Sequence, residues 1–239
     1  MPHTLYVIHG SHPCVTAERA LQLKRQPYRI VEYPPAAHVP AQWLRFRAIT
    51  VPALVLGSGE QVVGSRAIVH RLDELVPDPP LLPADGAARA RVVEAERWGD
   101  EVLQSLARRL AWIGLSARPD AIAGYAEGSR LPLPAFARAL VTPLVARVAA
   151  RRHRASVERA RRDLADLPAH LDRVDAWIGE GVMGGERLNA ADLQIGPSLR
   201  MLGSFGDVHP WLAGRPSWEL AQRVVPAFTG HLPAGALPV

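Results

Sequence analysis

The sequence predicts an α/β domain followed by an all-α domain. Two observations support this fold class. Strand-like and helix-like segments alternate up to about residue 75, whereas the later segments have the apolar spacing of helices. Residues 77–83 carry four prolines in seven positions, a composition typical of a stiff linker. We therefore predict domains over residues 1–76 and 87–239, joined by a Pro-rich linker over 77–86.

The first domain is predicted to have the element order β-α-β-α-β-β-α. Its strand segments are short and apolar, and its helical segments repeat apolar residues three and four positions apart. Strands are expected over 4–10, 28–33, 53–56 and 61–63, and helices over 14–24, 39–48 and 65–75. Gly57-Ser58-Gly59 separates the last two strands and indicates a hairpin. A parallel β-α-β opening that ends in a hairpin and a helix implies a small mixed sheet with helices packed on it.

The second domain is predicted to be a helical bundle. Helices are expected over 87–115, 134–162, 164–178 and 188–202. The tail beyond Phe205 contains five prolines, which leave room for at most one short helix, near 217–224.

Composition narrows the class of protein. The chain has 239 residues, enough to bury a sizeable core, and 48% of them are apolar. No apolar run approaches the roughly 20 residues of a membrane span, and the N-terminus lacks the cationic start of a secretory signal. Cys14 is the single cysteine, which excludes an internal disulfide and a cysteine-based zinc site. We therefore expect a cytoplasmic protein without a metal ion and without a membrane partner.

One charged segment raises the possibility of nucleic-acid binding. Arg147 to Arg162 contains seven arginines in sixteen residues, a density that could bind phosphates. The segment has no interleaved aromatic residues for base stacking, so a solvated helix face is favoured and a nucleic-acid partner is not expected. Asp163, Asp166, Asp172 and Asp175 follow it and are candidates to pair with it.

Four short patterns each have a simple structural explanation. They are Ser11-His12-Pro13-Cys14, Val51-Pro52, Gly64-Ser65-Arg66-Ala67-Ile68 and Asn189-Ala190-Ala191-Asp192. A turn, an edge-strand start and two helix caps would account for them. Two of them also suit a ligand. An X-Pro bond can be cis at small cost, which would open the Val51 backbone to a ligand, and the helix start at Ser65 would attract a carboxylate.

In this order and spacing, the four patterns resemble the glutathione S-transferase family, and the resemblance covers nearly the whole chain. The family pairs a thioredoxin-like N-terminal domain with a helical-bundle C-terminal domain. The resemblance implies an enzyme that activates the thiol of glutathione, its co-substrate, for attack on a small hydrophobic electrophile. It also implies a homodimer. Conjugation, thiol-dependent reduction and isomerisation all use the activated sulfur, and the sequence does not choose among them.

The resemblance assigns roles to individual residues. Val51, Pro52, Ser65 and Arg66 are expected to bind glutathione. Ser11 is expected to be the catalytic residue, because a hydroxyl that donates to sulfur near a helix N-terminus would stabilise the thiolate. Cys14 is a second catalytic candidate, since Ser11-x-x-Cys14 resembles a Cys-x-x-Cys pair. A lone cysteine at that position is more often a small core residue.

The helix over 87–115 is expected to line the acceptor-substrate side of the cleft. The candidate lining residues are Arg97, Glu101, Arg108 and Trp112, each four or seven positions after the one before it. The alternative is an ordinary solvated face with the tryptophans in the core.

Two positions depart from the family pattern. Gly64 stands where the family has Glu or Gln, and Thr50 stands where it often has Lys or Arg. Another thiol, or a catalytically weak member that binds a hydrophobic ligand or a protein partner, is therefore the alternative.

Overall fold

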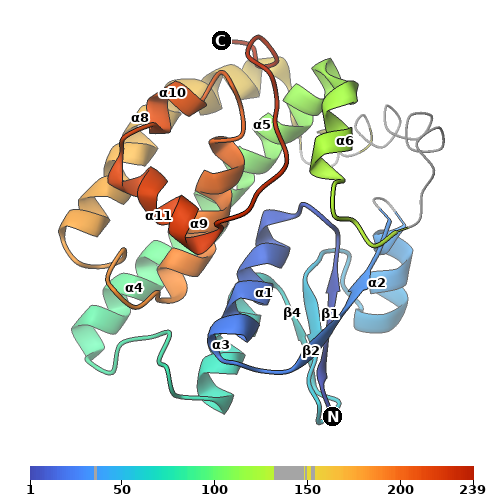
Figure 1. Cartoon of the computed structure of the whole chain (residues 1–239), viewed down its shortest axis with the longest axis vertical. Coiled ribbons are helices and arrows are strands. Elements are labelled where there is room, and N and C mark those ends of the chain that lie inside the picture. The colour runs from blue at the N-terminus through green and yellow to red at the C-terminus, as the bar shows by residue number, and fades with distance from the viewer. Residues whose placement is uncertain (35–36, 132–147, 149, 152–153) are drawn as a thin grey trace.

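A computed structural model describes residues 1–34, 37–131, 148, 150–151 and 154–239 of the chain (Figure 1). Most of the predicted helix over 134–162 lies outside the described residues. The same is true of Arg147 and Arg152 in the basic segment.

The N-terminal domain contains a four-stranded mixed sheet with the strand order β2-β1-β3-β4. The strands are β1 (His3–Val7), β2 (Tyr28–Glu32), β3 (Ala53–Val55) and β4 (Gln61–Val63). β1 pairs in parallel with β2, while β3 is antiparallel to both β1 and β4. The sheet confirms the predicted β-α-β opening and closing hairpin, which is the thioredoxin-like arrangement.

Three helices cover this sheet, and their positions match the prediction to within two residues. They are α1 (His12–Leu23), α2 (His38–Phe46) and α3 (Ser65–Leu75). α1 and α3 contact each other and the C-terminal helices, whereas α2 lies at the other side of the sheet (Figure 1). α2 packs through Phe46, whose ring makes an edge contact with Tyr6 of β1 at 5.1 Å between centroids.

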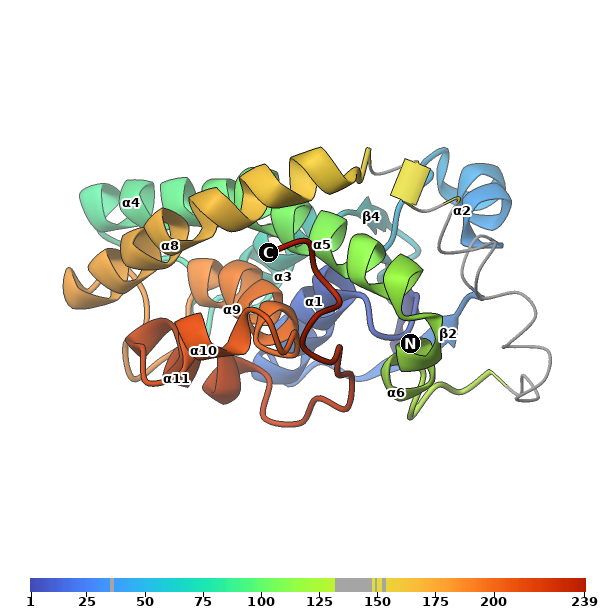
Figure 2. The same ribbon diagram turned by 90° about the horizontal axis from the view of Figure 1, so that it is seen from above.

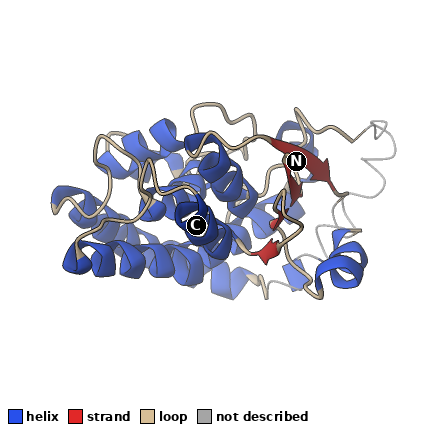
Figure 3. Ribbon diagram, turned by 90° about the horizontal axis from the view of Figure 1, so that it is seen from below, coloured by secondary structure: helices blue, strands red, loops and turns tan. Residues whose placement is uncertain are grey.

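The rest of the described chain is helical, and strands are confined to one end of the molecule (Figure 3). The α-helices are α4 (Gly86–Trp98), α5 (Gln104–Ala117), α6 (Ile122–Tyr125), α8 (Val157–Gly179), α9 (Ala190–Leu202), α10 (His209–Leu212) and α11 (Pro216–Val224). A π-helical turn over Gly99–Leu103 joins α4 to α5, and a 3-10 turn over Pro119–Ala121 precedes α6.

Several boundaries differ from the prediction. β1 ends at Val7 rather than at Gly10, because residues 9 and 10 form a turn before α1. α8 begins at Val157 and continues to Gly179, so the predicted helix end at 162 is wrong. Ser156 caps the start of α8, since its side chain accepts a hydrogen bond from the Arg159 amide, so residues 157–162 belong to this helix and not to a preceding one. The tail also holds two short helices rather than one, because Pro210 at the start of α10 is compatible with the first turn of a helix.

Three of the four aspartates expected to pair with the basic segment have other partners among the described residues, whereas Glu158 of α8 does pair with Arg162 of that segment. Asp163 forms a two-bond ion pair with Arg109 of α5, and Arg215 donates to both Asp172 and Asp175. These pairs attach α8 to its neighbouring elements.

α9 lies at the centre of the molecule and connects the two domains (Figure 2). All of its residues except Arg200 are buried, and Asn189 and Asp192 form the predicted capping box at its start. On the α1 side, the Thr16 hydroxyl donates to the Leu193 carbonyl at 2.8 Å. α9 therefore holds the sheet domain against the helical bundle.

The proline-rich segment between α3 and α4 is packed in place. Lys24, whose side chain is fully buried, donates to Asp73 and to the carbonyls of Val76 and Pro79, each at 2.6 Å. Asp73 also accepts from the amide of Leu81, which is buried. The only lysine of the chain thus holds the connection between the domains.

Candidate functional site

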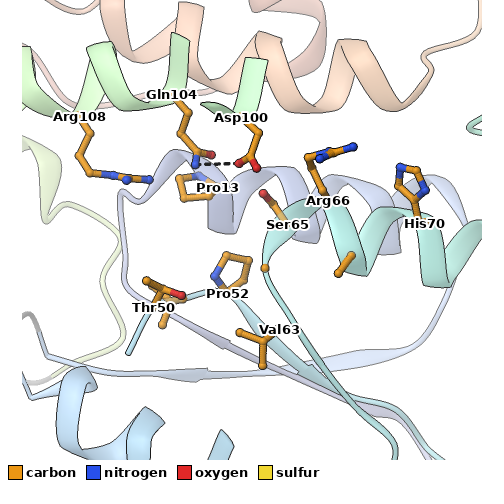
Figure 4. Close-up of a pocket in the computed structure, with 13 residues that line it drawn as sticks. Pro13, Thr50, Pro52, Val63, Ser65, Arg66, His70, Asp100, Gln104 and Arg108 are labelled. Carbon is orange, nitrogen blue, oxygen red and sulfur yellow. Dashed lines mark hydrogen bonds between the residues drawn. The ribbon is translucent and has the colours of Figure 1, made fainter. Parts of the chain in front are cut away.

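A cavity of about 640 Å³ lies between the sheet domain and the helical domain (Figure 4). It is lined from four directions: the start of α1, the segment before β3, the β4–α3 turn with the first turns of α3, and the wall formed by the π-helical turn and α5. The lining residues are Pro13, Thr50, Val51, Pro52, Val63, Gly64, Ser65, Arg66, Ala67, His70, Asp100, Gln104 and Arg108.

The four residues predicted to bind a thiol peptide, Val51, Pro52, Ser65 and Arg66, all line this cavity. The Val51–Pro52 peptide bond is cis. The Pro52 carbonyl accepts a hydrogen bond from the Gly64 amide at 2.9 Å, which joins the strand start to the helix start. Residues that are twelve positions apart in the sequence thus form adjacent walls of one cavity.

Gly64 has a backbone reason to be glycine. Its φ is 95°, in the region of positive φ that residues other than glycine rarely adopt. This conformation turns the chain from β4 into α3 and places the buried Ser65 at the first position of that helix. The unpaired amides of a helix start favour an anion, so the Ser65 end of the cavity suits a carboxylate.

Ser11 precedes α1 as its N-cap, but its side chain makes no capping hydrogen bond. It is half-buried and is not among the cavity-lining residues, whereas Pro13, two positions later, lines the cavity. The structure therefore places Ser11 beside the cavity, at the N-terminal end of α1.

Cys14 is a core residue. It is 4% exposed, and burial raises the pKa of its thiol to about 11, although hydrogen bonds from Ser11 and the Ile8 backbone and the charge of Arg108 oppose that rise. A nucleophilic cysteine needs the opposite environment, with a lowered pKa and some exposure. The predicted catalytic role of Cys14 has no support in this geometry.

The helical wall is displaced by one position from the predicted face. Of the four predicted acceptor residues, only Arg108 lines the cavity, whereas Arg97 and Glu101 are exposed. Trp112 is half-buried and packs against the core. The wall consists instead of Asp100, Gln104 and Arg108.

The π-helical turn explains this displacement. A π-turn closes its hydrogen bonds over five residues, so it adds a residue to one turn and rotates the face that follows. The prediction assumed an uninterrupted α-helix. The sequence carries only a weak signal for this wall: Glu96, Asp100, Gln104 and Arg108 are polar residues spaced four apart, among several other charged residues of the same segment.

Glu96, which does not line the cavity itself, contacts two basic residues that do. Its side chain is fully buried, and its Oε2 lies 2.7 Å from Nε2 of His70 and 3.4 Å from Nε of Arg66. A buried carboxylate requires charged or hydrogen-bonding partners, and these two side chains provide them. The Arg66 guanidinium is thereby positioned beside Ser65, as Figure 4 shows.

Asp100 presents a carboxylate to the cavity. Its Oδ1 accepts hydrogen bonds from the side-chain amides of Gln104 and Gln194, each at 3.1 Å. Gln194 comes from α9, is 1% exposed, and also donates to Gln104 at 3.1 Å. Burial raises the pKa of the Asp100 carboxyl above its ordinary value, and the charges of Arg66 and Arg108 oppose that rise.

The Ser65 end of the cavity therefore combines a helix start and a guanidinium with a carboxylate. This arrangement is complementary to a zwitterion, such as the free amino-acid end of a peptide.

Among the described residues, no group of His, Cys, Asp and Glu has the geometry to hold a metal ion. Within the same residues, no helix is long and apolar enough to cross a membrane.

Comparison with known proteins agrees with this architecture. Residues 5–80 match the family model of the glutathione S-transferase N-terminal domain. No curated protein matches the chain significantly.

Solved structures extend the likeness to the whole chain. A glutathione S-transferase from Rhodospirillum rubrum F11 has a TM-score of 0.63 and 22% identity, over 93% of this chain and 87% of that one. The β-etherase LigF from Sphingobium sp. strain SYK-6 has a TM-score of 0.64 and 20% identity, over 93% and 100%.

A third similar structure contains a ligand. It is a glutathione transferase homologue from Sulfitobacter with bound glutathione, with a TM-score of 0.55 and 17% identity over 95% of this chain and 93% of that one. The chain therefore has a glutathione S-transferase N-terminal domain and, over its whole length, the fold of the glutathione S-transferase family.

Proposed function

We propose that this protein binds glutathione in the cavity between its domains and activates the thiol for attack on a small electrophile. The observation that carries the proposal is the meeting of Val51–Pro52, Ser65, Arg66 and Asp100 around one cavity. A γ-glutamyl peptide has a carboxylate and an ammonium at one end, and these groups complement the charges found there.

In the proposed complex, Asp100 compensates for the main departure from the family pattern. Gly64 has no side chain to meet the ammonium of the γ-glutamyl group. The Asp100 carboxylate lines the same cavity and is fixed by two amide donors. In the proposed complex, the ligand carboxylate binds the start of α3 with Ser65 and Arg66, and the ammonium binds Asp100.

The sulfur in this complex lies toward the N-terminus of α1. The Ser11 hydroxyl would donate a hydrogen bond to the thiolate, and the helix start would lower the thiol pKa further. The thiolate then forms a bond to the electrophilic carbon of a small hydrophobic acceptor. The bond from that carbon to its leaving group breaks, the leaving group departs with the electron pair, and the thiol proton goes to solvent. We also propose that the protein is cytoplasmic and forms a homodimer. Sedimentation equilibrium tests the dimer.

Isothermal titration with glutathione tests the binding step. The wild-type protein is expected to bind glutathione, and Ser65→Ala is expected to weaken binding by about tenfold or more, because a charge-assisted hydrogen bond contributes about 1.5–3 kcal/mol. Ser58→Ala, at an exposed serine of the β3–β4 turn, is the matched control and should bind like the wild type. Absence of binding at millimolar glutathione would refute the proposal.

The chemical step separates an enzyme from the alternative, a catalytically weak ligand- or protein-binding member. An enzyme conjugates glutathione to an activated aryl halide faster than the uncatalysed reaction. Ser11→Ala should lower kcat/KM and raise the apparent pKa of the glutathione thiol, as seen in the pH profile of kcat/KM. Binding without conjugation would favour the ligand-binding alternative. Unchanged kinetics in Ser11→Ala would remove Ser11 from the catalytic role.

A further inference from the structure

Arg108 lies at the end of the cavity opposite the residues that complement the γ-glutamyl group. Its side chain extends from α5 toward Pro13, at the Thr50 end, whereas Arg66 and His70 are at the other end (Figure 4). Arg108 is half-buried, and its charge acts on both Asp100 and Cys14, the latter one turn into α1. It is therefore a cation at the α1 end of the cavity.

This end of the cavity favours negative charge for two independent reasons. The N-terminus of α1 carries the partial positive charge of a twelve-residue helix. The guanidinium of Arg108 adds a full positive charge with a planar set of donors that fits a carboxylate in a two-bond geometry. In a partly enclosed cavity, such a pair is stronger than at an open surface.

The proposed glutathione complex uses the other charges of the cavity. Ser65, Arg66 and Asp100 are assigned to the amino-acid end of glutathione. Arg108 lies at the other end of the cavity from Ser65 and Arg66, and eight residues beyond Asp100 on the same helical wall (Figure 4). An acceptor that approaches the sulfur from the helical side meets Arg108 on α5. The position of this residue thus bears on the choice of acceptor.

We infer that the second substrate is an electrophile that carries an anionic group, of the carboxylate class, and that Arg108 binds this group beside the thiol. This inference rests on the proposed function and makes it more specific. It also modifies the expectation of a purely hydrophobic acceptor, because Asp100, Gln104 and Arg108 make the helical wall polar.

A matched pair of aryl chlorides tests the inference. The probes are 4-chloro-3,5-dinitrobenzoate and its methyl ester, which share the reacting carbon and differ in charge. In both, the thiolate sulfur forms a bond to the ring carbon, the carbon–chlorine bond breaks with its electron pair on chloride, and the thiol proton goes to solvent. Substitution is redox-neutral and needs no further reactant.

In the wild-type protein, KM is expected to be lower for the carboxylate than for the ester by about tenfold or more, the effect of about 1.4 kcal/mol. Arg108→Gln should remove this preference by raising KM for the carboxylate, with KM for the ester and Kd for glutathione unchanged. Arg97→Gln is the control, because Arg97 is an exposed arginine of α4 that does not line the cavity. This variant should retain the preference for the carboxylate.

Three results would overturn the inference. The first is equal KM values for the two probes in the wild type. The second is a preference that survives in Arg108→Gln. The third is a weakened Kd for glutathione in Arg108→Gln, which would assign the residue to the thiol peptide instead. Direct titration with glutathione keeps the two proposals apart, since failure to bind glutathione contradicts the proposed function, and binding without charge preference contradicts only this inference.

Discussion

At the scale of single residues, chemical identity alone does not decide function in this chain. Ser11 and Cys14 are three positions apart and both carry groups able to take part in thiol chemistry. Ser11 lies at the N-terminal end of α1 beside the cavity, whereas Cys14 is buried in the core. Burial penalises the charged form of a thiol, so the same helix start that suits a ligand thiolate does not activate Cys14.

The state of Cys14 leads to a test that uses the single cysteine of the chain. The native protein should react with a thiol-specific disulfide reagent only slowly at pH 8, and one equivalent should react rapidly after unfolding, because the thiol is buried and the pKa is about 11. Cys14→Ala, the control, should show no reaction in either state. Rapid reaction of the native protein would contradict the core assignment.

The raised pKa of the Cys14 thiol makes the stability of the fold depend on pH. The pKa of the Cys14 thiol is raised from an unperturbed value of 9.0 to about 11, so the folded state holds the proton more tightly than the unfolded state. Its contribution to stability is fully present below pH 9 and is lost as the pH rises from 9 through 11. Relative to Cys14→Ala, the wild type should therefore lose stability in that window.

At the scale of elements, a one-residue irregularity sets which side chains reach the site. The π-helical turn over Gly99–Leu103 brings Asp100 and Gln104 to the cavity and leaves Glu101 exposed. The turn lies where Gly99 packs closely against α9: a methyl group added at Gly99 would lie 2.6 Å from Cγ1 of Ile195. The close contact of the two helices requires the absence of a side chain.

Gly99→Ala is therefore expected to destabilise the protein by about 1–3 kcal/mol, the usual effect of overpacking a core. An alanine in a helix normally stabilises relative to glycine, so the sign of the effect is the test. Gly86→Ala, at the start of α4 with open space around the added methyl group, is the control and should be neutral or stabilising. Urea unfolding of both variants provides the measurement, and a stabilised Gly99→Ala would exclude the close packing.

At the scale of the whole molecule, the site depends on how two domains are held together. Its walls come from the sheet domain and from α5, and α9 joins them through its contacts with α1, α4 and α5. Lys24 contributes a second connection, since it holds Asp73 together with two carbonyls of the segment before α4. Both connections are buried.

Lys24→Met should lower the free energy of unfolding by about 3–5 kcal/mol, because removal of one partner leaves the other charge of a buried pair uncompensated. Arg71→Gln removes the surface ion pairs with Glu60 and Glu74 and is the control, for which little or no loss of stability is expected. Chemical denaturation measures both changes. Equal losses in the two variants would mean that burial adds nothing to the Lys24 pair.

The order of elements was predictable from the sequence because it depends on local patterns. The hairpin over residues 53–63, the helix from Ser65 to Leu75 and the capping box at Asn189 follow from apolar spacing, turn residues and caps within about ten residues. Local patterns alone made Val51-Pro52 and Ser65-Arg66 a strand start and a helix start, and their expected role in binding came from the resemblance to a family.

The composition of the helical wall was not predictable in this way. Whether position 100 or 101 faces the cavity depends on a π-turn and on the approach of α9 to Gly99, a contact across almost one hundred residues. The position of the Asp100 carboxylate likewise depends on Gln194, which donates a hydrogen bond to it from that distant helix. Local patterns determine which elements form, whereas long-range packing determines which of their side chains meet.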